Sequence, residues 1–101
     1  MTKIEIGKHL NVDAIIMKNE KLQVKLLPEI GFKIASIVYL PKQKEFLFQP
    51  TNKKYMYPNY RDKFEKYDTS GLDDVIPTID ECIYPNGKFK GMLLPDHGDV
   101  W

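Results

Sequence analysis

The stretch Leu22-Gln23-Val24-Lys25-Leu26 decides the fold class of this chain. Apolar and polar residues alternate along it with a period of two, which is the pattern of a half-buried β-strand. A second segment, residues 34–39, is apolar at nearly every position, which predicts a strand that is covered on both faces. Turn-forming residues at 28–31 separate the two segments. The chain is therefore expected to begin as β-structure.

Two further segments support this interpretation. Residues 15–17 form a short apolar run before a polar turn at 18–21, and residues 45–49 follow a charged turn as another expected strand. Short strands separated by turns every 8–12 residues, roughly, are typical of an antiparallel β-sandwich or barrel. The N-terminal stretch that contains His9 is polar and gives no sign of chemistry. We expect a mainly β, antiparallel β-sandwich.

Composition limits the classes of function. The chain has 101 residues, which allows one domain, over residues 1–101. Its 15 Lys and Arg nearly balance 14 Asp and Glu, so the net charge of +1 favours neither nucleic acid nor an anionic membrane as a partner. No apolar run approaches the roughly 20 residues that span a bilayer. Cys82 is the only cysteine, which excludes an intrachain disulfide and predicts a small buried residue in a cytosolic protein.

Aromatic residues crowd the middle of the chain. Three of them have the i, i+4, i+7 spacing that would place them on one face of a short helix. The alternative is a loop whose rings pin it to the core. Stacking on nucleic-acid bases is disfavoured because acidic residues cancel the local positive charge. The three aromatic residues are Tyr60, Phe64 and Tyr67, and the acidic residues are Asp62, Glu65 and Asp68.

Two pairs of carboxylates, Asp73-Asp74 and Asp80-Glu81, are candidates for acid–base chemistry or for metal ligands. Adjacent residues on a strand point to opposite faces, so neither pair forms a dyad by itself. Asp73 is also suited to capping a turn after Gly71. Both the functional and the structural interpretation stay open, with Asp73 as a candidate ligand contact.

His97 is the sharpest candidate for a binding residue. Asp96 and Asp99 flank it, and a nearby carboxylate favours the charged imidazolium, which can donate a hydrogen bond to a substrate hydroxyl. Gly98 permits a positive φ or the close approach of a ligand. Trp101 offers a ring for stacking on a pyranose. A turn histidine without a ligand is the alternative, and a metal site is disfavoured because no second cluster of ligands accompanies it.

Three segments together, residues 26–37, 68–79 and 94–101, resemble the N-terminal part of the aldose 1-epimerases, the galactose mutarotase-like proteins. The matching motifs are a Pro-x-x-Gly-x-Lys-Ile turn, an Asp-x-x-Pro-Thr-Ile segment and a Pro-x-His-Gly motif. The resemblance implies a large β-supersandwich, a sugar or sugar derivative as ligand, and no cofactor or metal. It implies that His97 holds the sugar, and we expect Asp96, Trp101 and Asp73 to contact it.

The same resemblance implies an isomerase that interconverts α and β anomers. The second histidine and the glutamate that would act as acid and base have no counterpart in this chain, so no catalytic residue is assigned. We therefore expect an N-terminal fragment that is inactive alone and able to self-associate through unpaired strand edges. A non-enzymatic carbohydrate-binding or structural module is the alternative. Phe32 replaces the second glycine that is usual in the turn, and no Asn-Arg pair typical of galactose-type enzymes is matched.

Overall fold

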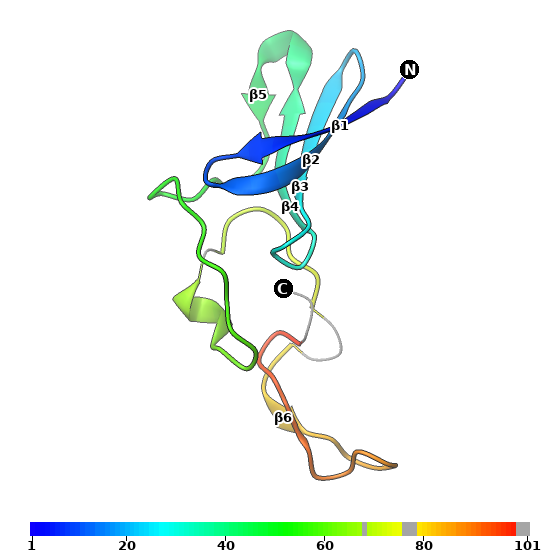
Figure 1. Cartoon of the computed structure of the whole chain (residues 1–101), viewed down its shortest axis with the longest axis vertical. Coiled ribbons are helices and arrows are strands. Elements are labelled where there is room, and N and C mark those ends of the chain that lie inside the picture. Colours follow the sequence, from blue (N-terminus) through cyan, green and yellow to red (C-terminus); the bar gives the residue numbers. More distant parts are fainter. Residues whose placement is uncertain (68, 76–78, 99–101) are drawn as a thin grey trace.

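A computed structural model describes residues 1–67, 69–75 and 79–98 of the chain (Figure 1). The described residues are mainly β, and their sheets are antiparallel, as the period-two pattern predicts. The strands are β1 Lys3–His9, β2 Val12–Lys18, β3 Leu22–Leu27, β4 Lys33–Tyr39, β5 Lys44–Glu45, β6 Cys82–Ile83 and β7 Leu93–Leu94. Two short 3-10 helices are η1 Leu40–Lys42 and η2 Phe64–Lys66.

The first five strands form one sheet in the order β1-β2-β3-β4-β5, in which each strand pairs with its neighbours in sequence (Figure 1). The expected strands at 22–26 and 34–39 are confirmed as β3 and β4. The expected strand at 45–49 is wrong beyond Glu45. The Glu45 carboxylate accepts hydrogen bonds from the Ser36 hydroxyl and from the backbone amides of Ile37 and Leu47, which turns the chain away from the sheet edge.

Strand β1 was not expected from the sequence, and His9 is part of it. His9 faces Val12 across a two-residue turn, and its side chain is buried beside Tyr55, with ring centroids 6.0 Å apart. Burial lowers the pKa of His9, and the positive charge of Lys25 lowers it further. The polar N-terminal stretch is thus an edge strand whose last residue reaches the core.

The turn between β3 and β4 uses two successive residues in the left-handed region. The backbone amide of Lys33 donates to the carbonyl of Ile30 at 2.9 Å, across Gly31 (φ 55°) and Phe32 (φ 54°). Such a turn favours glycine at both central positions. Phe32 therefore holds a strained backbone, and its side chain remains 56% exposed.

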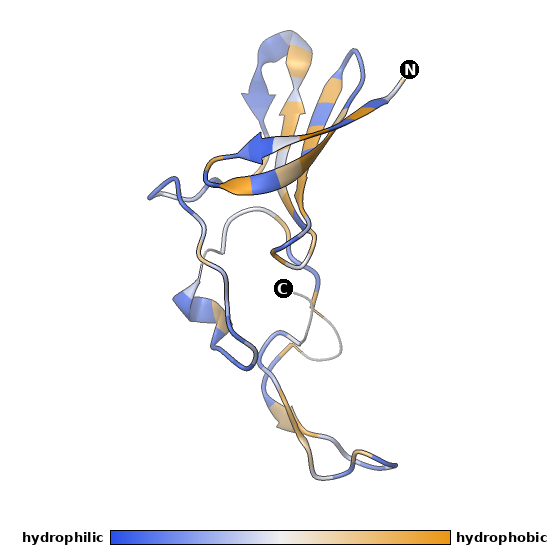
Figure 2. Cartoon of the chain, viewed as in Figure 1, coloured by the Kyte–Doolittle hydropathy of each residue, from blue (hydrophilic) through white to orange (hydrophobic). Residues whose placement is uncertain are grey.

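The two faces of the large sheet differ. One face is covered by the loop that follows β5, and the buried apolar residues gather there and in the turn after β3: Val12, Ala14, Leu27, Ile30, Ala35 and Tyr55. A bulge in β4 lets Ala35 add to this core, because Lys25 faces Ser36 while Leu26 faces Ile34. The opposite face carries apolar side chains from β1 to β4, and none of them is fully buried: Ile4, Ile6, Ile15, Met17, Leu22, Val24, Leu26, Ile37 and Tyr39. Figure 2 shows the apolar residues recurring along these strands.

The second half of the described chain extends away from the sheet. The radius of gyration is 16.0 Å, whereas a compact chain of this length has about 13 Å. Strands β6 and β7 form a separate hairpin at the far end (Figure 1). Cys82 lies exposed in β6, so the prediction of a buried cysteine is wrong, because this hairpin has no core beside it. The helices in the described part of the chain are too short and too polar to cross a membrane.

Candidate functional site

The carboxylate of Asp96 fixes the imidazole of His97. The Nδ1 atom of His97 lies 2.8 Å from Oδ1 of Asp96. A carboxylate only accepts hydrogen bonds, so Nδ1 is the donor and carries a proton. The other carboxylate oxygen accepts a hydrogen bond from the backbone amide of Phe64 at 2.9 Å. These two hydrogen bonds, the amide of Phe64 first, hold the pKa of Asp96 below its usual range.

The ring of Phe64 covers one face of the same imidazole. The two ring centroids are 3.9 Å apart, and the planes differ by 9°. Phe64 begins η2, so this helix supplies both the ring against His97 and the amide that binds Asp96. The side chain of His97 keeps 30% of its surface exposed. The Asp96–His97–Phe64 cluster therefore fixes the imidazole while leaving part of it open.

A tight turn presents His97. The amide of Gly98 donates to the carbonyl of Pro95 at 3.1 Å, and the amide of His97 donates to the carbonyl of Ile79 at 3.1 Å. The positive φ expected of Gly98 is confirmed at 77°, and His97 itself has a φ of 58°. A histidine in the left-handed region is strained, and such strain concentrates at functional sites.

Asp73 lies in a different environment from the one expected. Its carboxylate is 3.2 Å from the ammonium group of Lys33, and both side chains are buried, with 9% and 2% exposed. The same ammonium donates to the carbonyl oxygen of Ser70 at 2.8 Å and lies 6.0 Å from the ring centroid of Tyr55. The expected role of Asp73 as a ligand contact remains a prediction, and the structure gives it an ion pair that ties the loop to β4.

Gly71 allows the loop that carries Asp73 to approach β4 closely. Ile34 and Leu72 exchange backbone hydrogen bonds of 3.0 and 2.9 Å, which form an isolated β-bridge. Gly71 has a φ of 68°, and a Cβ atom there would lie 2.6 Å from the carbonyl oxygen of Ile34. Only glycine fits at this position, and it brings Asp73 within reach of Lys33.

Phe64 connects the two clusters. It lines a very small cavity between the loops together with Lys33 and Asp73, so one ring contacts both His97 and the surroundings of the ion pair. Tyr67, at the end of η2, lines the same cavity and donates its hydroxyl hydrogen bond to Asp62. This bond lowers the pKa of Asp62 and raises the pKa of Tyr67.

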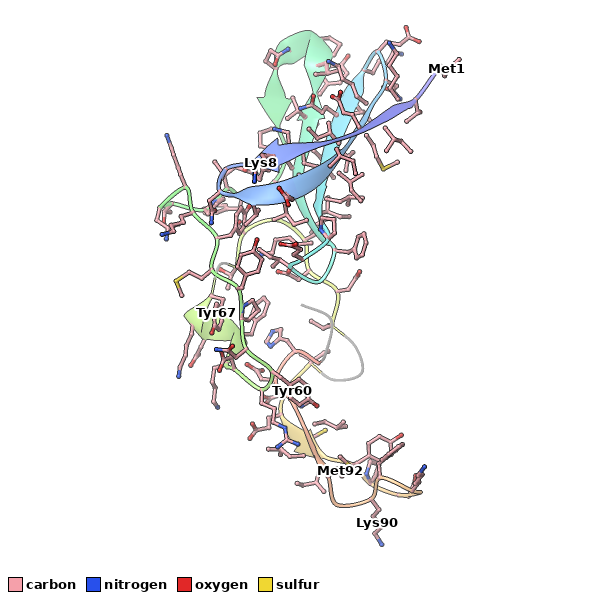
Figure 3. The ribbon with its side chains drawn as sticks, viewed as in Figure 1. Met1, Lys8, Tyr60, Tyr67, Lys90 and Met92 are labelled. Atoms are coloured by element: carbon pink, nitrogen blue, oxygen red, sulfur yellow. The ribbon has the colours of Figure 1, made fainter. Side chains whose placement is uncertain are left out.

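Tyr67, which Figure 3 shows beside η2, also lines a larger cavity of about 270 Å³. Its lining mixes two lysines, several hydroxyl and amide groups, and the exposed side chains of Phe48 and Met56. We call this space the Tyr67 cavity. Its lining residues are Phe48, Gln49, Pro50, Thr51, Asn52, Lys54, Met56, Lys66, Tyr67, Thr69 and Ser70.

The remaining candidates separate into two groups. Trp101 and Asp99 lie outside the described residues. Asp74, Asp80 and Glu81 are exposed. Across residues 1–67, 69–75 and 79–98, no three potential ligands gather to hold a metal ion.

The aromatic segment is a loop rather than a longer helix. Only residues 64–66 are helical, Tyr60 is 70% exposed, and Tyr55 is buried, in agreement with the interpretation of a loop pinned by its rings. Phe64 and Lys33 were missed as site residues. The helical spacing singled out Phe64, but nothing in the sequence indicated its contact with His97.

Comparison of the chain with protein-family models, curated proteins and solved structures finds no match. The function is therefore argued from the chemistry of the chain's own residues. The Asp96–His97–Phe64 cluster carries that argument, because it combines a fixed polar group with an aromatic ring.

Proposed function

We propose that this chain binds a sugar through the Asp96–His97–Phe64 cluster, as the sugar-contacting part of an aldose 1-epimerase-like protein of the cytosol. The observation that carries the proposal is the position of the His97 imidazole. Asp96 fixes it through Nδ1, Phe64 covers one face, and the ring remains 30% exposed.

The chemistry of the imidazole suits a sugar hydroxyl. With Nδ1 bound to Asp96, Nε2 is the nitrogen left for a ligand, and within the described residues it makes no hydrogen bond. A neutral ring accepts a hydroxyl hydrogen at Nε2, and an imidazolium donates to a hydroxyl oxygen. Both hydrogen bonds are available to a sugar, whose hydroxyl groups donate and accept. The strained φ of His97 is consistent with a position selected for binding.

The large sheet supports the architecture in this proposal. The side chains on its apolar face are partly or largely exposed. In a β-sandwich, such a face packs against a second sheet about 10 Å away. We therefore propose that the five-stranded sheet is one layer of a sandwich.

We further propose that this chain binds the sugar without interconverting its anomers. Ring opening needs one group to take the proton of the anomeric hydroxyl and another to protonate the ring oxygen. The resemblance assigns a role to one residue of this chain, His97, and that role is to hold the sugar. His9, the other histidine, is buried in the sheet.

The test is a titration of the ¹⁵N-labelled chain with a panel of free aldoses, followed by backbone and side-chain NMR shifts. We expect the wild type to bind and the dissociation constant of His97→Asn to be at least tenfold larger, because asparagine lacks the imidazole. Asparagine tolerates the left-handed backbone, so the turn should persist in this variant. Lys54→Ala, in the Tyr67 cavity, is the matched control and should bind as the wild type does. If Lys54→Ala lost sugar binding while His97→Asn kept it, the sugar would lie in the Tyr67 cavity, which would contradict the proposal.

Polarimetry on a freshly dissolved α-anomer tests the second part. The rotation should decay at the rate of buffer alone in the presence of the wild-type chain. Faster decay that His97→Asn abolishes would show that the chain is catalytic by itself.

A further inference from the structure

Strand β1 presents a free edge of the large sheet. Within the described residues it pairs only with β2, and it runs along the outside of the sheet from near Met1 to Lys8 (Figure 3). Its two isoleucines are largely exposed, Ile4 at 67% and Ile6 at 82%. A free strand edge is a template for pairing with another chain.

The turn between β1 and β2 determines which backbone groups are free. His9 and Val12 flank a two-residue turn and so form a hydrogen-bonded pair. Hydrogen-bonded and non-hydrogen-bonded pairs alternate along an antiparallel ladder. Lys3, Glu5 and Gly7 therefore bond to β2. The N–H and C=O groups of Ile4 and Ile6 point outward.

We infer that two copies of this chain pair through β1, antiparallel, with Ile4 opposite Ile4. In this register Lys3 of each copy lies opposite Glu5 of the other, as a non-hydrogen-bonded pair, in which the side chains approach most closely. The pairing thus forms two symmetric cross-strand ion pairs. The outward groups of Ile4 bond across the two-fold axis, and Thr2 pairs with Ile6 of the other copy.

The charges select this register among its neighbours. Because the residues with free backbone groups must face each other, the register changes in steps that keep odd residues opposite odd ones. One step in one direction places Lys3 opposite Lys3, and one step in the other places Glu5 opposite Glu5. A further step in that second direction leaves Lys3 opposite His9 and Glu5 opposite Gly7. Only the register centred on Ile4 brings opposite charges together.

The pairing also uses apolar surface. Ile4 faces Met17 in β2, and Ile6 faces Ile15, so all four side chains lie on the same face of the sheet. The second copy would continue this face with its own Ile4 and Ile6. The apolar face itself stays free in this dimer, so the inference is independent of the proposed sandwich and of sugar binding.

Sedimentation equilibrium over a concentration series, up to about 1 mM, tests the inference with charge-swapped variants. We expect the wild type to dimerise reversibly, and Glu5→Lys and Lys3→Glu each to weaken the dimer at least tenfold. An equimolar mixture of the two variants should regain dimerisation, because each Lys then meets a Glu. Glu81→Lys makes the same charge change at an exposed residue outside β1 and should behave as the wild type does.

A second variant tests the backbone pairing. Ile4→Pro removes an outward N–H that β2 does not use, so the hairpin persists while the dimer is lost. A wild type that is monomeric at 1 mM would overturn the inference. So would dimerisation of Glu5→Lys and Lys3→Glu to the wild-type extent, which would place the contact on the apolar face instead.

Discussion

The imidazole of His97 lies nearly parallel to the ring of Phe64, with 3.9 Å between their centroids. Phe64 belongs to the aromatic loop and His97 to the last described turn, so this contact joins two distant parts of the sequence. The amide of Phe64 also binds Asp96, which orients the imidazole. Phe64 thus contacts the imidazole directly and also holds Asp96, the residue that sets the tautomer of His97.

The buried ion pair between Lys33 and Asp73 is expected to be the most sensitive polar contact of the fold. Asp73→Asn removes a carboxylate that lies 3.2 Å from the buried ammonium group of Lys33, and it should lower the free energy of unfolding by about 3 kcal/mol. Urea denaturation measures this loss. Asp13→Asn breaks the exposed pair with Lys8, which water screens, and should cost much less stability. Equal losses in the two variants would contradict this account of the Lys33 environment.

Phe32 is expected to be a site where substitution stabilises the protein. Phe32→Gly relieves about 1–2 kcal/mol of left-handed strain, which exceeds the roughly 0.5–1 kcal/mol that glycine adds to the entropy of the unfolded chain. The exposed ring loses little packing. The melting temperature should therefore rise. Gly31→Ala, one residue earlier in the same turn, should lower it, and a fall in both variants would show that the Phe32 ring is needed.

His9 is expected to make stability depend on pH near neutrality. Burial lowers the folded-state pKa of His9, so the unfolded chain binds a proton more readily than the folded chain. The contribution of His9 to the free energy of unfolding is fully present above its pKa in the unfolded chain, which is about 6.5. It is lost as the pH falls through the lower pKa of the folded chain. Urea midpoints should fall between pH 7 and pH 5.

A variant of His9 tests that assignment. His9→Gln should flatten the pH profile of stability between pH 7 and pH 5. A His9→Gln variant that keeps the wild-type slope would refute the assignment.

The strands could be predicted where alternation was strong. Residues 22–26 and 34–39 carry enough apolar residues to indicate strands on their own. The alternation Lys3-Ile4-Glu5-Ile6 also has a period of two, and it was overlooked because charged residues on a free edge resemble a polar tail. The prediction of a strand beyond Glu45 was wrong because the Glu45 carboxylate accepts the hydrogen bonds of the Ile37 and Leu47 amides. The periodicity of a sequence does not indicate such a side-chain contact.

The candidate site was predictable only at short range. Asp96 and His97 are neighbours in sequence, so their pairing follows from adjacency. Phe64 is 32 residues from Asp96, and Lys33 meets Asp73 only because Gly71 lets the loop approach β4. Contacts of this kind depend on the folded path of the loops, which the sequence pattern alone does not reveal.

The ¹⁵N resonances of the His97 ring, followed during sugar titration, test the central claim most directly. We predict that Nδ1 carries the proton in the free protein and that addition of a bound aldose shifts Nε2. Asp96→Asn should weaken the preference for the Nδ1 tautomer and reduce the sugar-induced shift. An Nε2 resonance that stays unchanged while the sugar shifts resonances elsewhere in the chain would contradict a sugar site at His97.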